Sequence, residues 1–281
     1  MAIGKSLALG VLCCLMAARA SAAQVRAELL ANVSSVQAGK PFWLGVRLSI
    51  DPGWHVYWKN PGDAGLPTRV TYTLPDGFSA GPLQFPTPLR YDQPGNIVAF
   101  GYENSVLLLT RVTPPANLPA DFQGEFRAAV SWLVCSNVCI QGKQTVDLTL
   151  GSATPASPAN QELFDDWIRQ LPVDAGDCPN VADVRSRADN TGECVIEITW
   201  RDGAADSVEF LPGVLEDYNI SNTTVSTNDK TTVIRFKVQP LAGTAPPPTT
   251  LQAVVGYASK EGKRRGVNVS LVLGPAGANN H

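Results

Sequence analysis

The chain has 281 residues, with 22 basic and 25 acidic side chains, six cysteines and a formal charge of −3. This acidic balance argues against a nucleic-acid partner, which would select for a basic face. The length exceeds the usual single-core size of about 100 to 150 residues, so two domains are expected.

The first 22 residues have the layout of a cleaved secretory signal. Lys5 precedes an apolar run over 7–18, and small residues follow up to Ala22. Cys13 and Cys14 would leave with this signal peptide, which also takes two basic residues and leaves a formal charge of −5. No later stretch approaches the ~18 consecutive apolar residues of a membrane-spanning helix. We therefore expect an exported, soluble mature protein.

Short segments rich in Val, Leu, Thr and aromatic residues follow, separated by Pro and Gly clusters at roughly ten-residue spacing. This pattern predicts an all-β protein built from antiparallel sandwiches. The clearest strands of the first half are "FWLGVRLSI", "VTYTL", "VLLLTRV", "FRAAVSWLV" and "TVDLTL". Those of the second half are "CVIEITW", "VEFL", "TTVIRFKV", "LQAVVGYA" and "VNVSLVL".

Residues 51–70, "DPGWHVYWKNPGDAGLPTRV", are dense in aromatic and turn-forming residues. They predict a buried strand followed by a turn at "NPGDAG". His55 alternates with Trp54 along this strand, so one of the two side chains faces solvent or a groove. A lone histidine is more often an ordinary surface or hydrogen-bonded residue than a metal ligand.

Cys135 and Cys139 follow an apolar run in "SWLVCSNVCIQGK". A disulfide needs its Cα atoms ~4.4 to 6.8 Å apart, whereas four extended residues span ~13 Å, so a bridge requires the chain to fold back. Ser136 and Asn137 favour such a turn. The pair would then lie at the mouth of a hairpin, closing a ring too small to stabilise the fold as a long-range bridge does.

Three interpretations of this pair compete. Most disulfides in exported proteins are structural, whereas a strained or exposed bridge is the kind that exchanges. A structural zinc site is short of ligands, because the mature chain adds only His55 and His281 to its four cysteines. Two thiolates can bind Cu(I), so a copper site remains a minor alternative. Spacing alone does not decide between a staple and a redox pair.

One helix is predicted at residues 157–172, "SPANQELFDDWIRQLP", after the linker-like "GSATPASP". Ser157 can cap it and Pro158 suits its first turn. Its apolar residues recur at spacings of three and four on one face, which we expect to pack between the domains. The predicted boundaries are a signal peptide at 1–22, a first domain at 24–152, a linker with the helix at 153–175, a second domain at 176–274 and a tail at 275–281.

Cys178 and Cys194 lie either side of a predicted turn at "DNTGE". They do not face each other in a simple hairpin about that turn, and a structural disulfide closing a longer loop is the expectation. A second reactive pair is the alternative. The hairpin at 253–273 resembles the one at 128–150 but has no cysteines, which indicates a duplicated sandwich.

Four motifs carry a resemblance to a known family. "GWHVYWKNPGDAGLP", "FPTP", "FGYENSVLLL" and "WLVCSNVCIQGK" occur in this order and spacing. Together they resemble the N-terminal periplasmic domain of the thiol:disulfide interchange protein DsbD, in the variety found in the suppressor of copper sensitivity ScsB. The resemblance covers residues 40–150.

The resemblance implies two immunoglobulin-like sandwiches in the periplasm. It also implies the activity of a protein thiol-disulfide oxidoreductase that needs no cofactor. Electrons would pass from a membrane-embedded donor through Cys135 and Cys139 to oxidised periplasmic proteins, thioredoxin-like or other. In this family the second cysteine typically forms the mixed disulfide, so Cys139 would exchange and Cys135 would resolve. A non-catalytic binding module with structural disulfides and a Cu(I)-binding protein in copper tolerance remain the alternatives.

The sequence departs from its relatives in two respects. Gln141 stands where relatives often have proline after "CI", so the local rigidity is expected to differ. Full-length relatives continue into membrane and thioredoxin-like domains, so the electron donor is expected to be a separate polypeptide.

A shielding loop near the cysteines would correspond to "YDQPGNIVAFGYE". Phe100 or Tyr102 is the candidate shielding aromatic there. No Lys or Arg lies within the ring from Cys135 to Cys139, so activation must come from residues brought close by folding. Asp63, His55 and Tyr102 are the candidates for that role.

Overall fold

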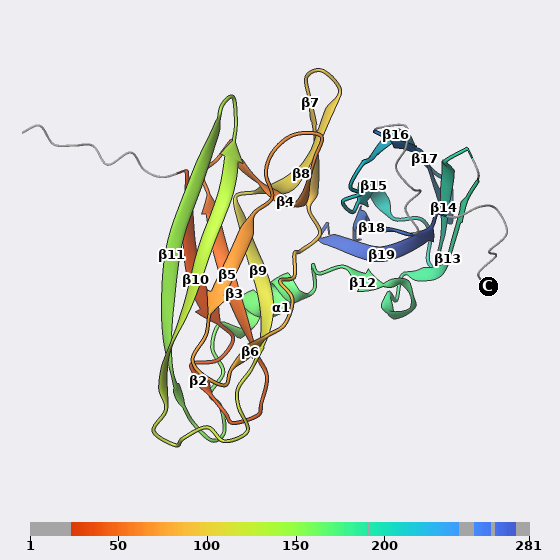
Figure 1. Cartoon of the computed structure of the whole chain (residues 1–281). Helices are drawn as coiled ribbons and strands as arrows, with labels where there is room; N and C mark the ends of the chain where they lie inside the picture. Colours follow the sequence, from red (N-terminus) through yellow and green to blue (C-terminus); the bar gives the residue numbers. More distant parts are fainter. Residues whose placement is uncertain (1–23, 190, 242–249, 260–261, 274–281) are drawn as a thin grey trace, which may run out of the picture.

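The computed structural model describes residues 24–189, 191–241, 250–259 and 262–273. The expected signal peptide and C-terminal tail lie outside these residues. Nineteen strands, one α-helix and one short 3-10 helix make up the described chain, which confirms the all-β prediction (Figure 1). None of the described helices is long and apolar enough to cross a membrane.

The first domain is a sandwich of two sheets. One sheet has the strand order β1-β3-β9-β6, and the other has the order β2-β11-β10-β4-β8-β7, with β5 also paired to β10. Its strands are β1 (Val25–Ala31), β2 (Ser35–Val36), β3 (Phe42–Ile50), β4 (His55–Gly62), β5 (Arg69–Thr73), β6 (Ser79–Ala80), β7 (Leu89–Gln93), β8 (Ile97–Glu103), β9 (Ser105–Thr113), β10 (Gln123–Cys135) and β11 (Cys139–Ser152).

The second domain is a smaller sandwich of two four-stranded sheets, ordered β12-β19-β18-β15 and β13-β14-β17-β16. Its elements are β12 (Val173–Asp174), η1 (Ala175–Asp177), β13 (Val181–Ala188), β14 (Glu193–Trp200), β15 (Asp206–Pro212), β16 (Tyr218–Thr227), β17 (Thr231–Pro240), β18 (Thr250–Ala258) and β19 (Arg264–Val272). Figure 1 shows the two sandwiches side by side, with the β7–β8 hairpin between them at the top.

Side-chain alternation builds the core of the first domain. In β10, every second residue from Gly124 to Trp132 is buried while its neighbours are exposed. Because successive side chains of a strand point to opposite faces, this places one apolar row between the sheets. Phe126, which is fully buried, meets Phe42 of the opposite sheet edge to face, with ring centroids 5.9 Å apart.

The helix α1 spans Gln161–Ile168 and is shorter than predicted. Ser157 does not cap it, because residues 157 and 158 pair in extended conformation with the first domain; Ser34 N–H donates to Ser157 O at 2.9 Å. Asn160 occupies the N-cap position instead. Phe164 packs α1 against β9 of the first domain.

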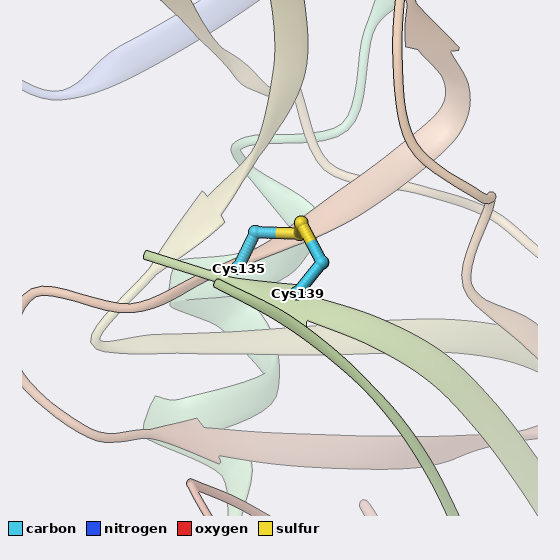
Figure 2. Close-up of a disulfide and its surroundings, with 2 residues drawn as sticks. All are labelled: Cys135 and Cys139. Atoms are coloured by element: carbon cyan, nitrogen blue, oxygen red, sulfur yellow. A yellow bond between two sulfur atoms is a disulfide. The ribbon is translucent and has the colours of Figure 1, made fainter. Parts of the chain in front are cut away.

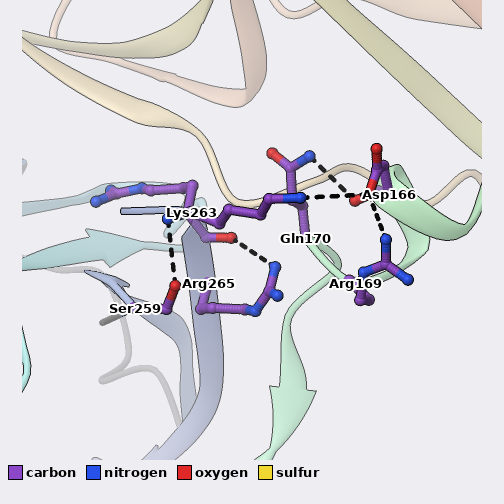
Figure 3. Close-up of polar contacts among 7 residues, drawn as sticks. Asp166, Arg169, Gln170, Ser259, Lys263 and Arg265 are labelled. Atoms are coloured by element: carbon purple, nitrogen blue, oxygen red, sulfur yellow. Dashed lines mark hydrogen bonds and ion pairs between the residues drawn. The ribbon is translucent and has the colours of Figure 1, made fainter. Parts of the chain in front are cut away.

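On its other side, α1 reaches the second domain through one ion pair, between Asp166 and Lys263 at 3.4 Å (Figure 3). The helix therefore covers a face of the first domain and also touches the second.

Candidate functional site

The site lies at the end of the longest hairpin of the molecule. β10 and β11 are paired from Gln123 opposite Gly151 up to Cys135 opposite Cys139. The Ser136 N–H donates to Val138 O at 3.0 Å and closes the turn at the predicted place. The two cysteines form a disulfide with their Cα atoms 4.2 Å apart (Figure 2). The bridge therefore joins directly opposed residues at the last rung of the ladder.

The two sulfur-bearing residues differ in their access to solvent. Cys135 is 1% exposed, whereas Cys139 is classed as exposed. Val138 and Ile140, which flank Cys139, are 61% and 40% exposed. A partner can therefore approach the disulfide from the Cys139 side, over a small apolar surface.

Cys135 belongs to a small apolar cluster on the outer face of its sheet, separate from the main core. We call this the cysteine cluster; its buried members are Tyr57, Ala99 and Cys135, with Tyr91 and Leu133 packed against them. Residues of the same strands that point the other way, such as Val56 and Val134, belong to the main core. Alternation along each strand thus places the disulfide on one face of the sheet and the main core on the other.

His55 lies opposite Cys135 in the pairing of β4 with β10. Its ring stacks on Tyr91, with centroids 4.9 Å apart, and meets Tyr57 edge to face at 5.2 Å. Burial lowers the pKa of His55 below its usual value, and the nearby Glu103 carboxylate opposes this effect. Among the described residues, His55 Nε2 and Tyr91 Oη are buried without a hydrogen-bond partner.

The structure does not place the expected shielding aromatics beside the disulfide. Phe100 and Tyr102 lie in the main core, where Phe100 meets Trp58 edge to face and Tyr102 Oη donates to Pro86 O at 2.6 Å. In β8 these two side chains point into the main core, whereas the adjacent Ala99 faces the cysteine cluster. The expectation for these two residues is corrected on this point.

Tyr91 is the aromatic residue that sequence reasoning missed. It lies opposite Ala99 in the β7–β8 hairpin, which puts it on the face of the cysteine cluster. The turn signal "DQPGN", which spans the end of β7 and the turn before β8, marks the hairpin and was the available clue. Burial and the Glu103 carboxylate raise the pKa of Tyr91, so its hydroxyl remains protonated at neutral pH.

Asp63 has a structural contact rather than a place beside the sulfurs. Its Oδ2 accepts a hydrogen bond from Val98 N–H at 2.8 Å, and its own N–H donates to Val98 O at 2.8 Å. These bonds fix the loop after β4, whose Gly65 touches the ring of Tyr57. Asp63 thereby fixes the loop that packs against Tyr57 of the cysteine cluster.

The expected bridge between Cys178 and Cys194 is not formed, and both are free, buried cysteines. Cys194 lies opposite Ala188, whereas Cys178 precedes Val181, which lies opposite Trp200 at the other end of the same strand pair. Six residues of extended strand span about 20 Å, far beyond disulfide range. The bridge is therefore geometrically excluded.

Each free thiol of the second domain has its own surroundings. Cys178 Sγ lies 3.4 Å from Tyr257 Oη, and Cys194 Sγ lies 3.5 Å from Gly192 O. Burial raises the pKa of Cys194 to about 12, so it is a poor nucleophile. No group of three or more potential metal ligands occurs among the described residues.

The first half of the chain has a recognisable family. Residues 23–151 match the family model of the thiol:disulfide interchange protein DsbD, N-terminal. These residues belong to the DsbD N-terminal domain family. Domains of this family exchange electrons with a membrane partner and with periplasmic substrates.

A solved structure extends the likeness beyond the DsbD N-terminal domain. The N-terminal periplasmic domain of ScsB from Proteus mirabilis matches 89% of this chain over 92% of its own, with a TM-score of 0.63 and 18% identity. This match shows that both sandwiches share its fold. The periplasmic chaperone SfaE matches at a TM-score of 0.21 and 8% identity, covering 85% of this chain and 97% of its own, which supports no argument. No curated protein sequence matches the chain.

Proposed function

We propose that this protein is a periplasmic thiol-disulfide interchange protein. It relays electrons through Cys135 and Cys139 from a membrane-embedded donor to oxidised periplasmic proteins. The observation that supports this most is the asymmetric bridge at a hairpin end, with Cys139 exposed and Cys135 buried. A structural staple gains nothing from an exposed sulfur, whereas an exchanging disulfide requires one.

In the forward reaction the reduced carrier acts on a substrate disulfide. The Cys139 thiolate attacks one substrate sulfur, and the other leaves as a thiolate that takes up a proton. The Cys135 thiolate then attacks Cys139 Sγ, which releases the substrate as a dithiol and forms the Cys135–Cys139 bridge. Two electrons pass from the carrier to the substrate.

Reduction of the Cys135–Cys139 bridge by the donor is the same exchange in reverse. A donor thiolate attacks the exposed Cys139 Sγ, and Cys135 leaves as a thiolate. The second donor thiol displaces Cys139 and becomes a disulfide. The apolar side chains of Val138 and Ile140 give either partner a contact surface around the sulfur that is attacked.

His55, which lies opposite Cys135, is the polar group available to Cys135 during these steps. Because its pKa is lowered, His55 is mainly neutral at pH 7, and its unpartnered Nε2 can accept the proton of the Cys135 thiol. Asp63 acts only through the loop that backs Tyr57.

Trapping tests the relay directly. The exported Cys135→Ser chain retains Cys139 but lacks the resolving thiol, so mixed disulfides should accumulate on Cys139 in the periplasm. The matched control is Cys139→Ser, which should accumulate none. Absence of adducts from Cys135→Ser, with the protein folded and exported, would count against the proposal.

A glutathione titration separates the remaining functions. The relay requires a reversible potential well above the ~−300 mV typical of structural disulfides. A pair that stays oxidised throughout would favour the binding module with a structural disulfide. Stoichiometric Cu(I) uptake by the reduced protein, lost in Cys139→Ser, would favour the copper-binding alternative.

A further inference from the structure

The β7–β8 hairpin, which carries Tyr91, is held at its base by hydrogen bonds from the second domain. Arg264, at the start of β19, donates from Nε and Nη2 to the Pro88 carbonyl oxygen at 3.0 and 2.8 Å. Pro88 directly precedes β7. Arg264 is also paired with Glu209 of β15, and their side chains are only 14% and 27% exposed. Charge-assisted bonds in such partly buried positions hold their geometry well.

Thr87, the residue before Pro88, is also held by hydrogen bonds. Thr87 donates from its N–H and its Oγ1 to the Gln170 carbonyl oxygen, at 2.9 and 3.0 Å. Gly266 of β19 lies against the Thr87 side chain so closely that a Cβ there would fall 2.3 Å from Thr87 Oγ1. The segment entering the hairpin is therefore fixed by the linker and by β19 together.

The hairpin itself has few other supports. Among the described strands, β7 is the last of its sheet and is paired only with β8. From there, Tyr91 stacks on His55 and packs against the cysteine cluster. The Glu209 carboxylate of the second domain also contributes to raising the pKa of Tyr91, so the two domains interact electrostatically at this point.

We propose that the second domain controls the reactivity of the Cys135–Cys139 disulfide, with Arg264 as the positioning residue that holds Tyr91 in the cysteine cluster. The inference rests on the proposed function for its biological meaning, but its chemistry does not need a protein partner. It gives the second sandwich, which has no disulfide of its own, a role in the relay.

The control acts on the leaving group of the exchange. A dithiol reductant attacks the exposed Cys139 Sγ, the S–S bond breaks, and Cys135 leaves as a thiolate that water protonates. The second thiol of the reductant then displaces Cys139 and closes to a disulfide, so two electrons enter the protein. Apolar surroundings disfavour the Cys135 thiolate and slow this reaction. Loosening the hairpin admits water to the thiolate and speeds it.

The test is the rate at which dithiothreitol reduces the disulfide in the mature full-length chain. Arg264→Ala should accelerate reduction by about fivefold, the equivalent of losing a contact worth about 1 kcal/mol. Arg264→Lys keeps the ion pair and one donor, so its reduction rate should lie between those of the wild type and Arg264→Ala. Tyr91→Ala should accelerate reduction at least as much, and adding Arg264→Ala to it should change the rate no further.

The matched control is Lys263→Ala, which removes a neighbouring interdomain ion pair that ends on α1 instead of the hairpin. Its reduction rate should equal that of the wild type. Acceleration by Tyr91→Ala but not by Arg264→Ala would overturn the role of the second domain. If the double variant were reduced faster than Tyr91→Ala by the full factor that Arg264→Ala gives alone, Arg264 would not act through Tyr91. Failure of the trapping experiment, by contrast, would leave these rates unaffected.

Discussion

Gly65 shows how one residue outside the cysteine pair supports the site. Its φ is +114°, and a Cβ there would fall 2.4 Å from the Tyr57 ring. The loop can approach the cysteine cluster this closely only because Gly65 has no side chain. The aromatic ring of Tyr57 is thereby held between the loop and Cys135's neighbours.

We expect Gly65→Ala to lower the free energy of unfolding by about 2 to 4 kcal/mol, from backbone strain and displacement of the ring. Gly53→Ala is the matched control, because Gly53 also has positive φ but has nothing within 4 Å. It should cost about 1 kcal/mol from strain alone. Urea unfolding measures both, and equal losses would contradict the close packing of Gly65 on Tyr57.

His55 gives the protein a predictable pH dependence. Burial lowers its pKa, so below the unfolded value of about 6.5 the unfolded chain binds more protons than the native one. The stabilising contribution is therefore fully present above pH 6.5 and is lost as pH falls toward the native pKa. Urea unfolding at pH 7.5 and 5.5 should show a smaller loss of stability in His55→Asn than in the wild type. The same loss in both proteins would assign the effect to other groups.

Strand pairing decides which cysteines form a disulfide and which stay free. Cys135 and Cys139 occupy the same rung of β10–β11, whereas the β13–β14 register puts Cys178 and Cys194 at opposite ends. In the unreduced mature chain, Ellman's reagent should therefore count two thiols in 8 M urea and four after reduction. Neither free thiol should react quickly in native buffer, because both are buried. No thiols before reduction would contradict the structure.

Local patterns predicted much of this arrangement and failed where pairing with distant residues decides. "FWLGVRLSI" coincides with β3, and the turn residues Ser136 and Asn137 located the disulfide. Tyr91 was missed because the turn signal marks the β7–β8 hairpin but does not show which face of the sheet Tyr91 lies on. Ser157 suits a helix start, but its backbone pairs with residue 34 far back in the chain.

The two sandwiches share buried apolar surface and so should not unfold independently. Leu211 of β15 and Val254 of β18 belong to the second domain but pack within the main core of the first. Asn60 adds a polar contact by donating to Pro212 O at 2.8 Å. A cleft of about 270 Å³ lies beside this contact, lined by both domains.

Leu211→Ala should therefore weaken both domains, at a cost of about 2 to 5 kcal/mol. Native-state hydrogen exchange measures each domain separately and should show faster exchange in β4 and β8 as well as in β15 and β18. Val214→Ala is the control, because Val214 borders the same cleft but is 63% exposed. Its effect should stay within about 0.5 kcal/mol. Faster exchange confined to the second domain would argue against a shared core.

The position of the disulfide at the last rung of β10–β11 determines how much the protein must rearrange when the bridge opens and closes. The ladder below it runs without interruption back to Gln123 and Gly151, and its hydrogen bonds do not depend on the sulfur–sulfur bond. Opening the bridge frees only the three-residue turn between the cysteines, so the conformational entropy of the chain changes little. The oxidised and reduced forms are therefore expected to have nearly the same scaffold. In the proposed relay, electrons enter and leave without a folding step in either direction.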